Sequence, residues 1–202
     1  MGIGIARWEK KENSEASIPA KVGMRSHILE YVAPSRVFDG FCGHRTMYKA
    51  IWHKADFYIP CDESKWELGD PPRYVCDNRR LLRCLDLSRF NIFDFDAFGS
   101  PWDQVLLIAH RRKWATGEMG GLVITDGATL KTRWGELPHS MATLCGMDSA
   151  KVACTTSRSE PLRRLAISNF AKISGVEVKK QWEAVGPPPA CVYYGAIVFD
   201  GL

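Results

Sequence analysis

The chain has 202 residues, of which 46% are apolar and 25% are charged, and its formal net charge is +4. This composition predicts a single globular domain with a substantial core and excludes a disordered or fibrous chain. The weak positive charge is compatible with a polyanionic partner but does not require one.

The predicted elements begin after a polar segment. Residues 1–23 mix acidic and basic side chains, and we expect an N-terminal arm there, followed by one domain over residues 24–202. A helix is predicted at 24–32, ending before Pro34. Alternating segments then predict an α/β fold, with a parallel sheet covered by helices on both faces. The expected strands are 36–40, 57–61, 73–76, 91–96 and 121–125, and the expected helices lie at about 45–55, 78–85 and 102–116.

The C-terminal part of the chain departs from this alternation. A helix is expected at 161–173, and strands are expected at 176–182 and 192–200. Prolines at 187–189 lie between these strands and cannot donate backbone hydrogen bonds. Because no helix joins the two strands, we expect a hairpin that leaves one antiparallel strand at the end of the sheet.

The cysteine pattern bounds the chemistry and the compartment. Seven cysteines form no C-x-x-C pair, which argues against a zinc ribbon or a redox dithiol, so we expect no metal site. Their odd number and the absence of a signal peptide favour a reducing, cytoplasmic environment. No apolar stretch approaches the roughly 20 residues that span a bilayer, so we expect no membrane partner.

Polar residues follow the first three expected strands in order. The first strand ends in Asp39 and a glycine-containing turn, which lets a nucleoside approach the backbone closely. An acid after the second strand is placed to grip a ribose, and Asn78 after the third to meet an adenine edge. Each acid alone is more often part of a structural ion pair than of a ligand site, but their recurrence favours an uncharged nucleoside over a pyrophosphate. The candidate cofactor-binding residues are Asp39, Gly40, Phe41, Gly43, His44, Asp62, Glu63, Asp77, Asn78 and Asp94.

The segment after the fourth strand carries the candidate chemistry. Methylation of an amino group requires its lone pair to be aimed at the methyl donor, and an acid that accepts one N–H holds the amine and takes its proton. A backbone carbonyl assists, and an aromatic ring two residues further on stacks against a base. Asp96, the carbonyl of Ala97 and the ring of Phe98 supply these elements in order, so we assign them as catalytic.

The neighbouring residues are candidates for substrate binding. Ser100, Pro101 and Trp102 follow the catalytic segment directly, although tryptophans on helices more often belong to the core. Arg45 stands where a third glycine would allow close approach to a cofactor. It therefore either points outward toward substrate or indicates an altered cofactor geometry.

This segment resembles the Asp-Leu-Asp-Pro-Phe-Gly-Ser-Pro signature of tRNA guanine-N2 dimethyltransferases. Looser similarity includes Leu144-Cys145-Gly146, residues 163–175 and the closing segment Tyr193 to Val198, and it covers roughly residues 24–202. The resemblance implies a Rossmann-like class I methyltransferase fold, with a seven-stranded, mostly parallel sheet and an antiparallel last strand. It also implies S-adenosylmethionine as cofactor and methyl transfer to an exocyclic amine of a nucleobase, most simply guanine N2 in tRNA-like RNA.

The departures from that family leave alternatives open. Ala97 replaces the proline after the catalytic acid, and the glycine turn keeps only Gly43. Relative to the family, the N-terminal substrate segment is shortened and the C-terminal tRNA-binding domain is missing. RNA is favoured over DNA, but DNA, a protein or a small molecule are alternative acceptors. A cofactor-binding, non-catalytic subunit that needs a partner for target recognition is the remaining alternative.

Overall fold

The computed structural model describes residues 15–64, 74–127, 136–147, 156–186 and 192–202. Its centre is a seven-stranded sheet with the strand order β3-β2-β1-β4-β5-β7-β6. Strands β1 to β5 pair in parallel, and β7 runs antiparallel to both β5 and β6. This confirms the expected sheet. The strands are β1 (Arg36–Asp39), β2 (Phe57–Asp62), β3 (Tyr74–Val75), β4 (Ile92–Asp96), β5 (Met119–Asp126), β6 (Val176–Val185) and β7 (Tyr193–Gly201).

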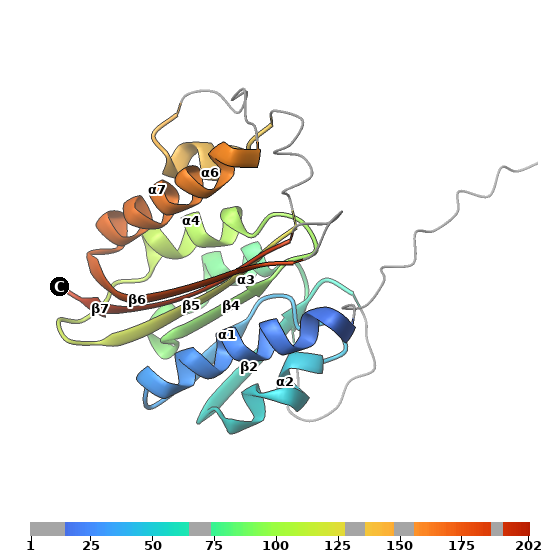
Figure 1. Cartoon of the computed structure of the whole chain (residues 1–202). Coiled ribbons are helices and arrows are strands. Elements are labelled where there is room, and N and C mark those ends of the chain that lie inside the picture. The colour runs from blue at the N-terminus through green and yellow to red at the C-terminus, as the bar shows by residue number, and fades with distance from the viewer. Residues whose placement is uncertain (1–14, 65–73, 128–135, 148–155, 187–191) are drawn as a thin grey trace, which may run out of the picture.

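Helices cover both faces of the sheet (Figure 1). One apolar layer contains Met24 and Met47, from α1 and α2, and the opposite layer contains Leu82, Val105 and Phe170, from α3, α4 and α7. No helix that the structure describes is long and apolar enough to cross a membrane. The helices are α1 (Ile18–Tyr31), α2 (Thr46–Ala50), α3 (Asn78–Cys84), α4 (Trp102–Arg111), α6 (His139–Leu144) and α7 (Thr156–Ser174), with 3-10 turns at Glu15–Ser17, Trp52–Lys54 and Leu87–Arg89.

The central strands are buried on both sides. In β4, residues Ile92 to Phe95 are all buried, as expected for a parallel strand between two helical layers. The register places Asp39 of β1 beside Asp94 of β4, and Asp96 beside Thr125 of β5. The carboxyl ends of these strands therefore bring their polar residues to one edge of the sheet, which we call the carboxyl edge.

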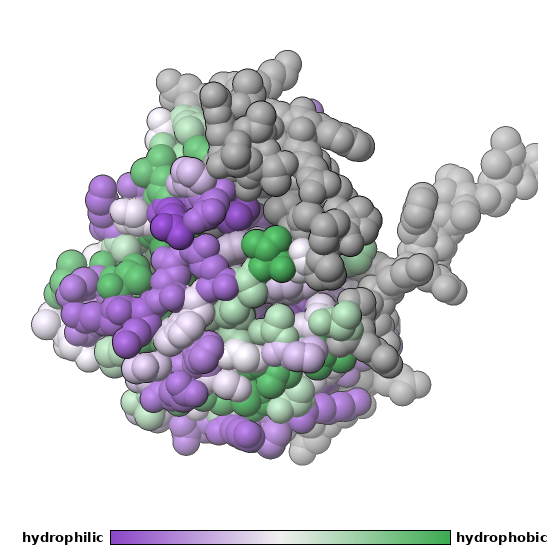
Figure 2. Space-filling model, viewed as in Figure 1, coloured by the Kyte–Doolittle hydropathy of each residue, from purple (hydrophilic) through white to green (hydrophobic). Residues whose placement is uncertain are grey.

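Strand β6 forms one outer edge of the sheet. Its surface is mainly hydrophilic in the space-filling view (Figure 2), and Glu177, Lys179, Lys180 and Glu183 are exposed there. Charged side chains on an edge strand disfavour pairing with another chain.

The structure corrects the expected N-terminal boundary. Helix α1 begins at Ile18, so residues 18–23 are helical and do not belong to an arm. Pro19 suits the first turn of a helix, where its missing N–H would have no partner. Lys21 gave the segment a polar appearance, but this side chain is buried against the sheet. Residues 1–14 lie outside the described part of the chain.

Candidate active site

The loop between β4 and α4 is held tightly at the carboxyl edge. The N–H of Gly127, just after β5, donates to the carbonyl of Gly99 at 2.9 Å. A Cβ at Gly127 would lie 2.6 Å from the carbonyl oxygen of Phe98, so only glycine fits this approach. The backbone is thereby fixed while the side chain of Phe98 remains 77% exposed. An exposed aromatic ring on a fixed loop is suited to stacking against a ligand.

Trp102 does not share this exposure. It is fully buried, and its indole Nε1–H donates to Asp126 Oδ2 at 2.9 Å. The expectation that Trp102 contacts a substrate is wrong for this structure, because the ring belongs to the core. Pro101 is also buried, and the Ser100 hydroxyl accepts the N–H of Trp102 at 3.4 Å. These residues therefore shape the start of α4 next to the loop.

Helix α1 brings two cations to the acids of β4. The Nε–H and Nη2–H groups of Arg25 donate to the two carboxylate oxygens of Asp94 at 2.7 and 2.8 Å. Trp52 adds a third hydrogen bond to Asp94 at 2.6 Å. The ammonium group of Lys21 lies 2.7 and 2.8 Å from the two oxygens of Asp96, which Arg25 also approaches at 3.5 Å. The candidate catalytic acid thus has a charged partner from α1.

Asp39 lies on the same side of the sheet. The hydroxyl of Tyr58 donates to its Oδ2 at 2.7 Å, and the N–H of Phe41 donates to its Oδ1 at 3.2 Å. Burial raises the pKa of Asp39 well above its usual range, and the charge of Asp94 raises it further. Ionising the Asp39 carboxyl group is therefore costly unless a cation lies beside it.

The turn after β1 is supported by side chains from two other elements. Asp62, at the end of β2, accepts the N–H of Gly43 at 3.0 Å. Asn78 donates from Nδ2 to the carbonyl of Gly40 at 2.6 Å and accepts from Gln104 at 2.8 Å. Both ends of the Asn78 amide thus have protein partners, and its expected contact with an adenine stays a prediction. Asp62 retains lone pairs with which to accept further hydrogen bonds.

Arg45 follows this turn in a left-handed conformation, with φ of 64°. Its guanidinium carbon lies 4.2 Å from the ring centroid of Tyr48, and the residue is only 6% exposed. It therefore does not extend outward into solvent. The Nε and Nη2 atoms of Arg45 are buried and have no hydrogen-bond partner among the residues that the structure describes. These are the same two atoms with which Arg25 holds a carboxylate, so Arg45 presents an unused anion-binding fork.

The remaining candidates lie around the same edge. Asp77 caps α3 by accepting the N–H of Arg79 at 2.9 Å, and its hydrogen bonds with the Arg79 side chain lower its pKa. His44 and Glu63 are exposed, and Phe41 packs against the core. Ala97 is buried directly after Asp96.

Sequence reasoning missed Lys21 and Arg25. The two residues are four apart, which places them on one face of α1, and this spacing was the available signal. Their acidic partners lie 75 and 69 residues further along the chain. Only the fold brings the two groups together.

Comparisons with known proteins agree with this architecture. No family model matches the sequence, and no curated protein matches it. Solved structures do match: TYW2 from M. jannaschii in complex with AdoMet has a TM-score of 0.56 at 10% identity, over 96% of this chain and 80% of that one. Trm1 from Pyrococcus horikoshii with S-adenosyl-L-methionine has a TM-score of 0.55 at 15% identity, over 95% of this chain and 56% of that one. An rRNA methylase from Streptococcus thermophilus has a TM-score of 0.50 at 11% identity, over 92% of this chain and 96% of that one.

At identities of 10–15%, these structural similarities show the fold alone. Together with the strand order and the reversed β7, they identify the Rossmann-like fold of class I methyltransferases in this chain.

Proposed function

We propose that the chain is an S-adenosylmethionine-dependent methyltransferase that acts on an exocyclic amine of a nucleobase in RNA, with guanine N2 as the first candidate. The observation that carries the proposal is the fixed loop after β4, which follows Asp96 with the exposed ring of Phe98. An acid and an aromatic face in this order suit an amine on a planar base. The matched structures with AdoMet and the matched rRNA methylase support the same choice.

The residues of the carboxyl edge fit this cofactor. The buried fork of Arg45 suits the carboxylate of the methionine part, since a buried guanidinium without an anion is costly. We therefore propose Arg45 as a ligand of the cofactor and not of the substrate. Asp62 suits the ribose hydroxyls. With Asp96 paired to Lys21, Asp39 and Asp94 share the charge of Arg25, which suits a positively charged sulfonium nearby.

Bound S-adenosylmethionine would supply an electrophilic methyl group. Asp96 would accept one N–H of the acceptor amine and the carbonyl of Ala97 the other, which aims the nitrogen lone pair. Phe98 would stack on the base and hold its plane. A base within a duplex would have to be flipped out to reach this site. Lys21 would have to leave Asp96, because its ammonium bonds both carboxylate oxygens.

Calorimetry with S-adenosylmethionine tests the cofactor site. We expect saturable binding to the wild type, and at least about ten-fold weaker binding to the R45Q variant, because an arginine–carboxylate pair contributes about 1.5–3 kcal/mol. The R164Q variant is the matched control, since Arg164 lies exposed on α7 and pairs with Glu160. No binding to the wild type would overturn the proposal. Tritiated-methyl transfer to tRNA, rRNA, DNA, protein and small molecules then identifies the acceptor.

The ion pair between Lys21 and Asp96 should limit access to the acceptor. We expect the K21M variant to show a kcat/KM for the RNA acceptor at least about five-fold above the wild type, since releasing this buried ion pair costs more than the roughly 1 kcal/mol of an exposed pair. Binding of S-adenosylmethionine should change little. The K172M variant, altered at an exposed lysine of α7, is the control. If K21M instead lowers kcat with an unchanged thermal midpoint, Lys21 assists the reaction and does not compete with the acceptor.

A further inference from the structure

The positive charge of the chain is concentrated on one surface. Residues 77–89 and 102–113, which contain α3, the turn Leu87–Arg89 and α4, hold seven arginine and lysine residues against three aspartates. Their net charge of +4 equals the formal net charge of the whole chain, so the acidic and basic residues in the rest of the chain are equal in number. Arg112 is buried and paired with Glu118, whereas the other six cations are exposed.

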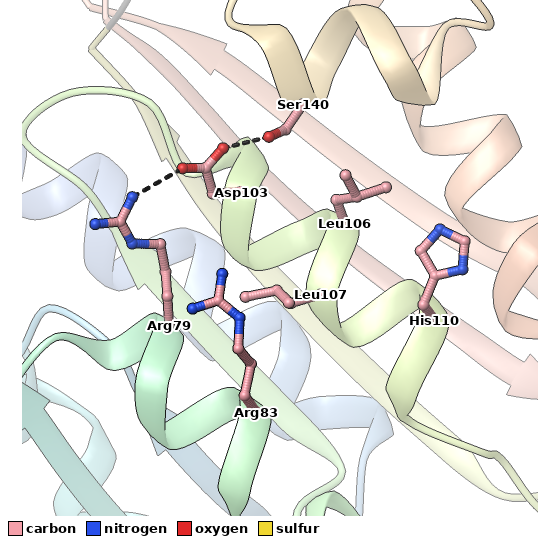
Figure 3. A pocket seen from close by; sticks show the side chains of 7 residues that line it. All are labelled: Arg79, Arg83, Asp103, Leu106, Leu107, His110 and Ser140. Atoms are coloured by element: carbon pink, nitrogen blue, oxygen red, sulfur yellow. Dashed lines mark hydrogen bonds and ion pairs between the residues drawn. The ribbon is translucent and has the colours of Figure 1, made fainter.

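A groove runs between the helices of this surface (Figure 3). Its volume is about 330 Å³. Arg79 and Arg83 extend from α3 toward Leu106, Leu107 and His110 of α4. Ser140 of α6 lies at one end, where it bonds Asp103. The groove thus has a partly apolar floor and a cationic wall on the α3 side.

The cations of the groove are only partly neutralised. Arg79 pairs with Asp77 at 2.9 Å and with Asp103 at 3.2 Å. Arg83 in the groove, and Arg80 exposed next to it on α3, form no ion pair within 4.0 Å with any residue that the structure describes. Solvated arginines whose charge is not balanced locally attract a repeating anion such as a phosphodiester chain.

The groove is also continuous with the candidate active site. Helix α4 begins directly after the loop that carries Phe98, and α3 begins directly after β3 at the carboxyl edge. Asp103, in the first turn of α4, therefore marks the end of the groove nearest the catalytic loop. A nucleic-acid strand that lies along α3 and α4 would lead toward the exposed ring of Phe98.

We propose that the groove between α3 and α4 binds the phosphate backbone of the nucleic-acid acceptor next to the modified nucleotide. The proposal rests on the proposed function and adds the surface that holds the acceptor. Arg83 in the groove and Arg80, exposed beside it on α3, contact phosphates, and Leu106 and Leu107 support the sugar or base between them. Combined basic and apolar surfaces of this kind bind single-stranded nucleic acid with little sequence preference.

Paired charge reversals test the groove. In the R80E/R83E variant, the dissociation constant for a fluorescent, unmodified tRNA transcript should rise at least about 30-fold at 0.1 M salt, because two phosphate contacts are lost. When the logarithm of the dissociation constant is plotted against the logarithm of the salt concentration, the slope for this variant should be about 1.5–2 lower than for the wild type. The control is K54E/K172E, which changes the net charge equally at exposed lysines outside the groove. It should stay within about three-fold of the wild type in RNA binding, and both variants should bind S-adenosylmethionine normally.

Three other outcomes would overturn the groove proposal. Equal weakening by both double variants would mean that net charge alone attracts RNA. Competition by polyglutamate as effective as competition by RNA would indicate an acidic protein partner. If the wild type binds S-adenosylmethionine but neither RNA nor single-stranded DNA, the groove proposal fails while the methyltransferase proposal stands. Preference for a DNA oligonucleotide over RNA would keep the groove and change the acceptor.

Discussion

Replacement of Asp96 by asparagine is expected to lower methyl transfer at least about 100-fold, with little change in the affinity for S-adenosylmethionine. A positioned acid that orients an amine and accepts its proton typically contributes 10²–10⁴-fold to the rate. Asparagine keeps the size of the side chain and one carbonyl oxygen, but it offers only a very weak base. The loss should therefore appear in kcat, measured as tritium transferred in a single turnover.

A matched control separates this effect from a general loss of structure. Asp86 is an exposed aspartate that caps the turn Leu87–Arg89, and asparagine caps such turns equally well. The D86N variant should therefore retain activity. Thermal unfolding of D96N should show a cooperative transition, although the loss of charge opposite Lys21 will lower its midpoint. Transfer by D96N at near wild-type rates would remove Asp96 from the chemistry.

The sequence predicted the parts of this site that local patterns encode. A strand that ends in an acid can be recognised from a short stretch of sequence. Asp39, Asp62 and Asp94 lie at or near the ends of β1, β2 and β4, which are neighbours in the sheet. The loop of Phe98 and Gly99 was likewise recognisable, because one continuous segment carries it. Parallel pairing then brings these separate ends to one edge without further information.

Contacts between distant segments could not be predicted in the same way. The burial of Trp102 depends on Asp126, which lies 24 residues away. The role of Lys21 depends on a register between α1 and β4 that no local pattern specifies. The sequence therefore favours an arm over residues 1–23, although the buried ion pair of Lys21 with Asp96 explains the polar residue in this part of α1 better.

Burial makes the ionisation of Asp39 costly, and the proposed cofactor site explains why the acid is retained. The unfolded chain releases this proton at the usual pKa, whereas the folded chain keeps it to a higher pH. The stability from this group is therefore fully present at low pH and is lost as the pH rises through the raised pKa. Ionised Asp39 beside Asp94 becomes favourable only when a cation binds nearby. The proposed sulfonium is such a cation.

The D39N variant should accordingly be more stable than the wild type and bind S-adenosylmethionine less well. Asparagine can accept from the N–H of Phe41 and donate to the hydroxyl oxygen of Tyr58, so both present contacts have replacements. Its advantage in the free energy of unfolding should grow as the pH rises above the usual range of an aspartate. It should reach about 1–2 kcal/mol, or roughly 2–8 °C in the thermal midpoint.

The affinity of the wild type for S-adenosylmethionine should increase with pH over the same interval, because bound cation favours the ionised form of Asp39. The D39N variant should bind about ten-fold more weakly and lack this pH dependence. Asp56 provides a control of opposite sign: its hydrogen bonds with Ser35 lower its pKa, so D56N should be less stable than the wild type at neutral pH, with a difference that disappears in acid. If D39N is less stable at every pH, the hydrogen bonds of the carboxylate outweigh the cost of burying it, and Asp39 is retained for the fold and not for the cofactor.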